Sequence, residues 1–249
     1  MNRFLKGAMI LTIAGVIVKI IGAFSKVLVA RILGGEGIGL YMMAYPIYQI
    51  IVSISAAGIP VAISIMIAEK LANRDMRGVQ QVFNVSLRVL TLVGIVFSVG
   101  LYASAEWLIK WNIITDPRAL IPIQLLSPAI IVVTILSCFR GYFQGFQYMV
   151  PTGTSQVFEQ IFRVGSMVGL AYYFIDSGLH LAAGGATFAT FPGVLAGLIV
   201  LVYFYRSQRS LRQQMLSEQN EEAPIERTSA VIKRLFALAI PVSMANIML

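Results

Sequence analysis

Long apolar blocks alternate along the chain with short polar or glycine-rich breaks. A bilayer core about 30 Å thick is crossed by about 20 residues of helix, because each residue adds about 1.5 Å. A last apolar run, 235–249, has only about 15 residues and is too short to span. The pattern therefore predicts an all-α integral membrane protein, with a six-helix transmembrane lobe and the start of a seventh helix. The six blocks are at about residues 7–33, 40–68, 81–104, 119–140, 155–175 and 181–205.

This pattern divides the chain into three parts. We expect the six-span lobe over residues 1–205, a cytoplasmic linker over 206–233 and a truncated seventh helix over 234–249. The linker is the only long polar segment; it is either a solvated connector or, in part, an amphipathic helix on anionic headgroups. The last apolar run ends at Leu249 without a polar flank. We therefore expect a C-terminal lobe of the same protein to be missing from this chain.

The distribution of basic residues predicts the orientation in the cell membrane. With a cytoplasmic N-terminus, twelve lysines and arginines fall on the inner side and three on the outer side, and four inside spans complete the 19. Because basic residues favour the cytoplasmic side, the N-terminus is predicted to be inside. The first apolar run continues past Lys19 to Leu33, longer than the apolar part of a signal peptide, so we expect a retained first span.

Composition excludes several classes of protein. The chain is 58% hydrophobic and 12% charged, with a mean hydropathy of +0.81. Soluble domains carry about 45–50% apolar and about 25% charged residues, so a bilayer protein is indicated. One cysteine and one histidine cannot fill the four-ligand shell of a zinc or iron–sulfur site, and we expect no metal or cofactor.

Charge and motifs narrow the function further. The net charge of +8 comes from basic residues that punctuate apolar blocks, which argues against nucleic acid as a partner. No glycine-rich phosphate loop has the spacing of an ATPase, and no pair of carboxylates accompanies a nucleophile at a membrane face. We therefore do not expect an enzyme.

Five charged residues lie inside the predicted spans. A lysine or arginine at a helix centre costs about 2.5–3.5 kcal/mol, so such residues usually face a bundle interior or a hydrated cavity. Four cations and one acid give these spans an excess charge of +3, which attracts an anion. We predict that these residues bind the substrate: Lys19, Lys26, Arg88, Glu159 and Arg163.

Helical spacing indicates which of these residues act together. Lys19 and Lys26 are seven residues apart and share one face of the first span with two small residues, Gly22 and Ala23. Glu159 and Arg163 are i, i+4 neighbours and either face the anion path or simply neutralise each other.

Snorkelling is the alternative for part of this set. Lys26 and Arg88 have stems long enough to reach an interface, whereas Lys19 lies near mid-membrane, too deep for this.

Two segments carry a resemblance to a known family. The first covers residues 15–48 and reads GVIVKIIGAFSKVLVARILGGEGIGLYMMAYPIY; it is followed by Gly58–Ser64 and Ala68-Glu69. The second comprises Arg140–Gly145, Pro151-Thr152 and Glu159–Val164. These segments resemble stage V sporulation protein B and its YtgP-type relatives. That group consists of polysaccharide-biosynthesis flippases of the MOP superfamily, which are related to the lipid II flippase MurJ and to MATE exporters.

The resemblance implies a transporter with two six-helix lobes that rock between inward-open and outward-open states. The implied cargo is an undecaprenyl-pyrophosphate-linked sugar, a peptidoglycan precursor, moved from the inner to the outer leaflet. Lys19 matches the first basic position of MurJ-type proteins, and Ser25-Lys26 stands where those proteins carry an Arg-Asp pair. The arginine pair of their second helix is replaced here by Ile50–Ser53.

Two other functions remain open at this point. A MATE-like, cation-coupled drug exporter would carry an acidic residue deep in the first lobe, where this chain has lysines. A non-transporting membrane scaffold for wall-synthesis enzymes is the third possibility, against which the charges inside the spans argue.

Overall fold

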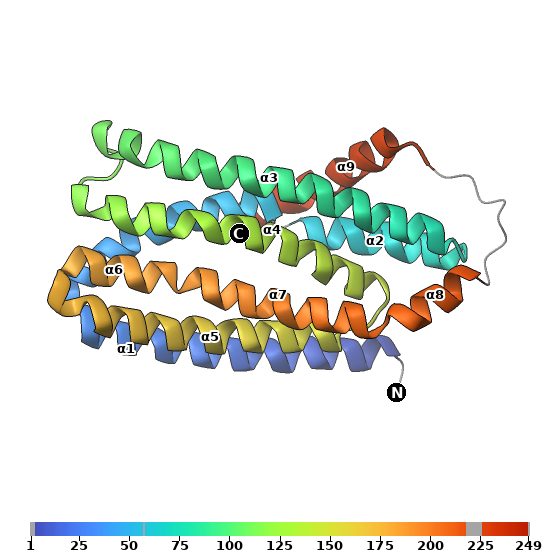
Figure 1. Ribbon diagram of the computed structural model, residues 1–249, viewed down its shortest axis with the longest axis horizontal. Coiled ribbons are helices and arrows are strands. Elements are labelled where there is room, and N and C mark those ends of the chain that lie inside the picture. The colour runs from blue at the N-terminus through green and yellow to red at the C-terminus, as the bar shows by residue number, and fades with distance from the viewer. Residues whose placement is uncertain (1–2, 57, 218–225, 249) are drawn as a thin grey trace.

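The chain folds into a bundle of long helices in the computed structural model, which describes residues 3–56, 58–217 and 226–248 (Figure 1). Within these residues all regular secondary structure is helical. The α-helices are α1 Arg3–Ala56, α2 Ile59–Ala72, α3 Met76–Lys110, α4 Leu120–Gly145, α5 Val150–Phe174, α6 Leu179–Phe188, α7 Thr190–Ser207, α8 Arg209–Ser217 and α9 Thr228–Met248. Two short 3₁₀ helices, Pro117–Ala119 and Ile175–Ser177, precede α4 and α6.

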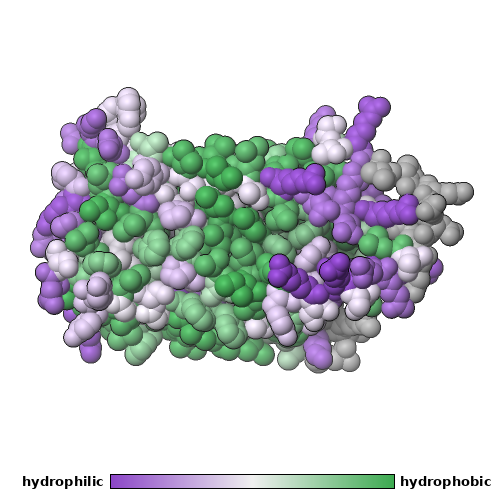
Figure 2. All heavy atoms as spheres, in the orientation of Figure 1, coloured by the Kyte–Doolittle hydropathy of each residue, from purple (hydrophilic) through white to green (hydrophobic). Residues whose placement is uncertain are grey.

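Membrane insertion is consistent with these helices. Among the described residues, five helical segments are long and apolar enough to cross a bilayer: Leu5–Ala72, Met76–Lys110, Pro117–Gly145, Leu179–Ser207 and Thr228–Ala245. Figure 2 shows an apolar band across the middle of the molecule, with hydrophilic residues gathered at both ends. The all-α membrane class is therefore confirmed, but the predicted number of six spans is not.

The first two predicted spans belong to one continuous helical element, α1, which turns back on itself at Gly34 (Figure 1). Gly34 has φ 66° and ψ −175°, a backbone conformation that residues with a Cβ rarely adopt. The two arms of α1 therefore run in opposite directions from this turn. We call the end of the bundle that contains this turn the Gly34 end, and the opposite end, which carries α8, the linker end.

Two predicted spans are interrupted in the structure. The block at 40–68 is divided between α1, which ends at Ala56, and α2, which begins at Ile59. Pro60 lies in the first turn of α2, where its missing N–H leaves no helical hydrogen bond unmade. It begins a helix instead of kinking one. The block at 181–205 is likewise divided into α6 and α7.

The fifth predicted block forms α5 but is not among the five apolar spans. Its hydropathy is reduced by polar residues in its first half, which include Gln156, Glu159, Gln160 and Arg163. Two of these residues, Gln160 and Arg163, line the cavity described below.

The boundary predicted between linker and seventh helix is displaced. Helix α9 begins at Thr228, six residues before the expected start, and α8 forms within the expected linker. Val231, Leu235 and Ala239 are buried, so the helix already has an apolar face before the apolar run begins. Lys233 lies on the exposed side of α9 and interrupts the run of apolar residues, so the sequence pattern did not reveal this apolar face.

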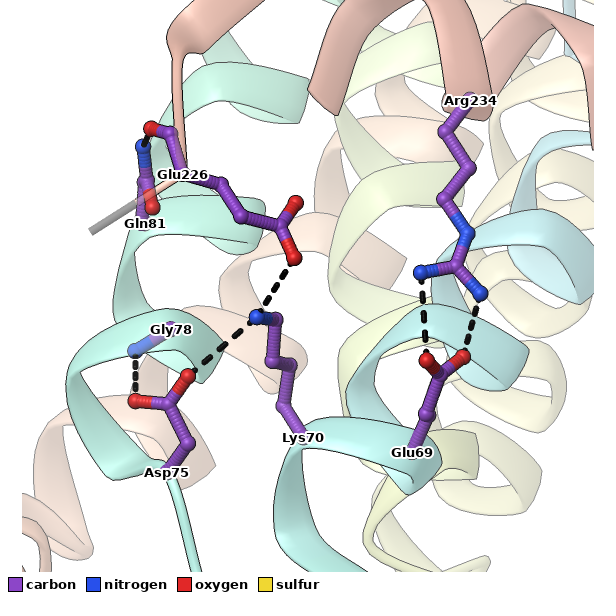
Figure 3. A network of polar contacts seen from close by, with 7 residues as sticks. All are labelled: Glu69, Lys70, Asp75, Gly78, Gln81, Glu226 and Arg234. Carbon is purple, nitrogen blue, oxygen red and sulfur yellow. Dashed lines mark hydrogen bonds and ion pairs between the residues drawn. The ribbon is translucent and has the colours of Figure 1, made fainter. Parts of the chain in front are cut away.

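Polar contacts tie the start of α9 to the turn between α2 and α3 at the linker end (Figure 3). The Lys70 ammonium lies 2.7 Å from the Glu226 carboxylate and 3.3 Å from that of Asp75. Asp75 also caps α3 by accepting a hydrogen bond from the Gly78 amide at 2.7 Å. Arg234 of α9 pairs with Glu69 of α2.

A second set of ion pairs lies at the Gly34 end. The Arg118 guanidinium contacts Glu36, just after the α1 turn, at 2.7 Å and Asp116 at 2.8 Å. Hydrogen bonds from the Arg118 side chain and amide hold the pKa of the Asp116 carboxyl below its ordinary value. Arg118 is about half exposed and Asp116 is partly exposed, so these contacts position the turn and contribute little stability.

Candidate anion-binding cavity

A cavity of about 420 Å³ opens between the two arms of α1 and the middle of α5. This volume lies within the range of about 300–1,000 Å³ that is common for small-molecule sites. Its wall is mostly apolar, with a small number of polar side chains. The lining residues are Lys19, Gly22, Ala23, Ser25, Lys26, Val29, Ile38, Tyr41, Met42, Tyr45, Gln160, Arg163 and Met167.

Three cationic side chains meet in this wall. Lys19 and Lys26 come from the first arm of α1, and Arg163 comes from α5. Lys19 and Lys26 are exposed and Arg163 is partly buried. Among the described residues that line the cavity there is no aspartate or glutamate. The cavity therefore carries three formal positive charges without an opposite charge in its wall.

The wall on the α1 side has the composition that helical spacing predicts. Gly22 and Ala23 lie between the two lysines and also line the cavity. Because their side chains are small, they leave space between the cationic groups. A Cβ added to Gly22 would lie 3.1 Å from the Gln160 amide nitrogen, which shows how closely α5 approaches α1 here. That these residues bind an anion remains a prediction.

Gln160 and Arg163 form the polar wall on α5. The Arg163 guanidinium donates a hydrogen bond to the Gln160 side-chain oxygen, and Gln160 is only 3% exposed. A buried amide that accepts from a guanidinium restricts the rotamers of the arginine without neutralising its charge. Arg163 is therefore a fixed cation.

Glu159 lies elsewhere, in an ion pair with Arg140 of α4. The guanidinium and carboxylate are 2.7 Å apart, and both side chains are more than four-fifths buried. Arg140 also lies 3.4 Å from the Ser155 hydroxyl oxygen. The sequence spacing offered Arg163 as a neutralising partner of Glu159, but in the structure Glu159 pairs with Arg140. This leaves Arg163 to the cavity.

The structure also does not bring Arg88 to the cavity. Arg88 is exposed on α3, which contributes none of the lining residues. Val85 and Leu90, on either side of it, are buried, so the rotation of α3 directs Arg88 away from the bundle interior. This position fits the snorkelling alternative.

Sequence reasoning missed the aromatic residues of the site. Tyr41 and Tyr45 line the cavity, and Tyr48 is buried beside them. The ring centroids of Tyr41 and Tyr45 are 5.3 Å apart with planes at 16°, and those of Tyr45 and Tyr48 are 5.8 Å apart. Their spacing of four and three residues, which places side chains on one helix face, was the available signal.

Comparison with known proteins identifies the family. The family described as "Polysaccharide biosynthesis protein" matches residues 4–244, nearly the whole chain. The chain belongs to this family.

Curated relatives of this family member come from Bacillus subtilis (strain 168). Stage V sporulation protein B is 34% identical over 211 residues, which cover 85% of this chain and 40% of the relative. The lipid II flippase MurJ is 27% identical, with 96% of this chain and 46% of the relative covered. The chain thus spans about half the length of the curated relatives it matches.

Solved structures with the same fold are transporters. An outward-facing multidrug resistance MATE family transporter of the MOP superfamily has a TM-score of 0.80 at 15% identity, covering 98% of this chain and 52% of that one. A MOP superfamily transporter from Pyrococcus furiosus has a TM-score of 0.76 at 15% identity, covering 99% of this chain and 53% of that one. At such identities the likeness shows the fold, which is that of a MATE-like transporter. The expected resemblance and the multi-pass membrane location are confirmed.

Proposed function

We propose that this chain provides one wall of a flippase for a lipid-linked anionic sugar. The cargo is an undecaprenyl-pyrophosphate-linked sugar, such as a peptidoglycan precursor, which moves from the inner to the outer leaflet by alternating access. The observation that carries the proposal is the cavity with Lys19, Lys26 and Arg163 in its wall. Its charge is opposite to that of a pyrophosphate.

The chemistry of the three cations suits a pyrophosphate headgroup. A guanidinium can donate two parallel hydrogen bonds to phosphate oxygens, whereas an ammonium acts as a compact, mobile charge. In a site that is partly shielded from water these interactions are stronger than at a soluble surface, because the local dielectric is lower. The apolar band on the face of the bundle shown in Figure 2 allows the undecaprenyl tail to stay in the bilayer while the headgroup passes.

The proposal includes a cytoplasmic N-terminus and a second wall opposite this one. The first follows from the distribution of lysine and arginine along the chain. The second follows from alternating access, in which two bundles rock about a site near the midplane. The proposed source of this second wall is a C-terminal lobe of the same protein.

Competition binding tests the charge preference that separates a flippase from a MATE-like exporter. The purified protein in lipid nanodiscs is incubated with a fluorescent undecaprenyl-pyrophosphate-linked sugar. We expect displacement of this probe by undecaprenyl pyrophosphate, and weaker displacement as salt concentration rises, since the attraction is electrostatic.

Neutral undecaprenol and the lipophilic cation tetraphenylphosphonium serve as the two controls and are expected to displace nothing. Saturable binding of tetraphenylphosphonium, together with failure of undecaprenyl pyrophosphate to compete, would contradict the proposal and support the exporter.

A further inference from the structure

The three tyrosines of the second α1 arm form a short ladder beside the cations. Tyr41 stacks on Tyr45 almost in parallel, and the Tyr48 ring lies 5.8 Å from the Tyr45 ring, centroid to centroid, with its plane tilted by 42°. Tyr45 is thus the middle member, with one tyrosine ring four residues before it and another three residues after it. Tyr41 is the end of the ladder, so the side of its ring away from Tyr45 is not covered by another member.

The end of this ladder lies at the same level as two of the cations. Lys26 precedes Gly34 by eight residues and Tyr41 follows it by seven, so both lie about 10–12 Å from the turn on adjacent, oppositely directed arms. Arg163 is one helical turn beyond Gln160, which contacts α1 at Gly22, so it also lies near the level of Lys26. Lys19 is about 10 Å closer to the linker end.

The Tyr41 ring is rigidly supported, which distinguishes it from an aromatic residue that merely fills space. Tyr48 is 4% exposed, which fixes the base of the ladder, while Tyr41 and Tyr45 are partly exposed in the cavity wall. Pro46 lies within the same helical arm and fixes its own φ. A supported ring loses little conformational entropy when a ligand packs on it.

An aromatic face beside cations suits a sugar phosphate. A pyranose ring presents C–H groups with partial positive charge on one face, and the face of an aromatic ring carries partial negative charge. The sugar of a glycosyl pyrophosphate is joined directly to the phosphate through its anomeric oxygen. A cation and an aromatic ring at one level of the cavity can therefore contact the phosphate and the attached sugar at the same time.

We propose that Tyr41 is a sugar-binding residue, on whose ring the pyranose next to the pyrophosphate packs while Lys26 and Arg163 contact the phosphates. This inference rests on the proposed function and extends it, because it gives the cavity a preference for a glycosylated lipid over the bare lipid pyrophosphate. Tyr45 and Tyr48 are positioning residues that hold the Tyr41 ring in place.

Binding of two lipids tests the assignment. Dissociation constants of undecaprenyl pyrophosphate, with and without one attached sugar, are measured for the protein in nanodiscs. We expect the wild type to bind the glycosylated lipid about 3- to 10-fold more tightly, the size of effect that one aromatic contact provides. Tyr41→Leu should remove this preference and change the dissociation constant of undecaprenyl pyrophosphate less than about 2-fold.

Matched variants distinguish the contribution of the Tyr41 ring from general effects of substituting a tyrosine. Tyr41→Phe keeps the aromatic face and should retain the preference, as should Tyr102→Leu, which removes an exposed tyrosine of α3 outside the cavity. Tyr41→Met keeps bulk without a ring and gives the same readout where the leucine variant is not stable.

The outcomes distinguish this inference from the proposed function. Binding of both lipids with equal affinity by the wild type, or an unchanged preference in Tyr41→Leu, would overturn the role of Tyr41 and leave the flippase intact. Failure of the wild type to bind either lipid would overturn the proposed function itself.

Discussion

Replacing Lys19 by alanine is expected to lower the rate of precursor flipping at least about tenfold, at unchanged protein abundance. Lys19 is the cation closest to mid-bundle in the cavity wall, and it is exposed there. A hydrogen bond to a charged group contributes about 1.5–3 kcal/mol, which corresponds to roughly a 10- to 100-fold change in affinity or rate. The measurement is the appearance of the glycosylated lipid in the outer leaflet, detected with an impermeant probe, with abundance measured by immunoblot.

Arg88→Ala is the matched control for this experiment. It removes a cation from a predicted span, but one that lies outside the cavity on the exposed side of α3. We expect flipping within about twofold of wild type for Arg88→Ala, and partial recovery in Lys19→Arg, which restores the charge. Normal flipping by Lys19→Ala at normal abundance would show that Lys19 does not bind the substrate.

The second large effect is expected from Arg140→Ala, which leaves Glu159 without its partner between α4 and α5. The two side chains are 18% and 16% exposed, so the carboxylate would remain largely out of water. Breaking a buried pair costs about 3–5 kcal/mol, and partial exposure reduces this to about 2–4 kcal/mol. We expect a clear fall in the thermal unfolding midpoint in detergent and in steady-state abundance.

Two further variants show whether the unpaired buried charge causes the loss of stability in Arg140→Ala. Arg140→Met combined with Glu159→Gln removes both charges and should recover most of the lost stability. Arg234→Ala breaks the more exposed pair with Glu69, in which the side chains are 41% and 46% exposed, and should cost less than about 1 kcal/mol. An Arg140→Ala protein as stable as the wild type would show that this ion pair contributes nothing to the packing of α4 on α5.

The fold could be predicted largely from the length and spacing of apolar residues. Block length located the helices, and a period of 3.6 residues placed Lys19 and Lys26 on one small face of α1, which the structure brings to the cavity. Breaks inside helices were harder to locate. The break between Ala56 and Ile59 lies in an apolar block where no charged residue marks it, although Gly58 and Pro60 adjoin it.

The site was predicted less completely, because partners are chosen by tertiary packing. Glu159 is near Arg163 in sequence, but α4 places Arg140 close enough to pair with it instead. The rotation of α3, which leaves Arg88 exposed, depends on which of its faces packs on α4. The tyrosines belong to the site because the second arm of α1 folds back at Gly34 and brings them to the cavity, which their positions in the sequence alone do not show.

Thiol labelling at Ala23 tests most directly whether a hydrated, anion-binding chamber exists. Ala23 is exposed in the cavity wall between the two lysines, and the native Cys138 is buried, so Ala23→Cys introduces the only accessible thiol. We predict that a water-soluble maleimide modifies this thiol in nanodiscs and that undecaprenyl pyrophosphate, but not undecaprenol, slows the reaction several-fold. A thiol that does not react, or that reacts at the same rate with and without the lipid pyrophosphate, would contradict the account.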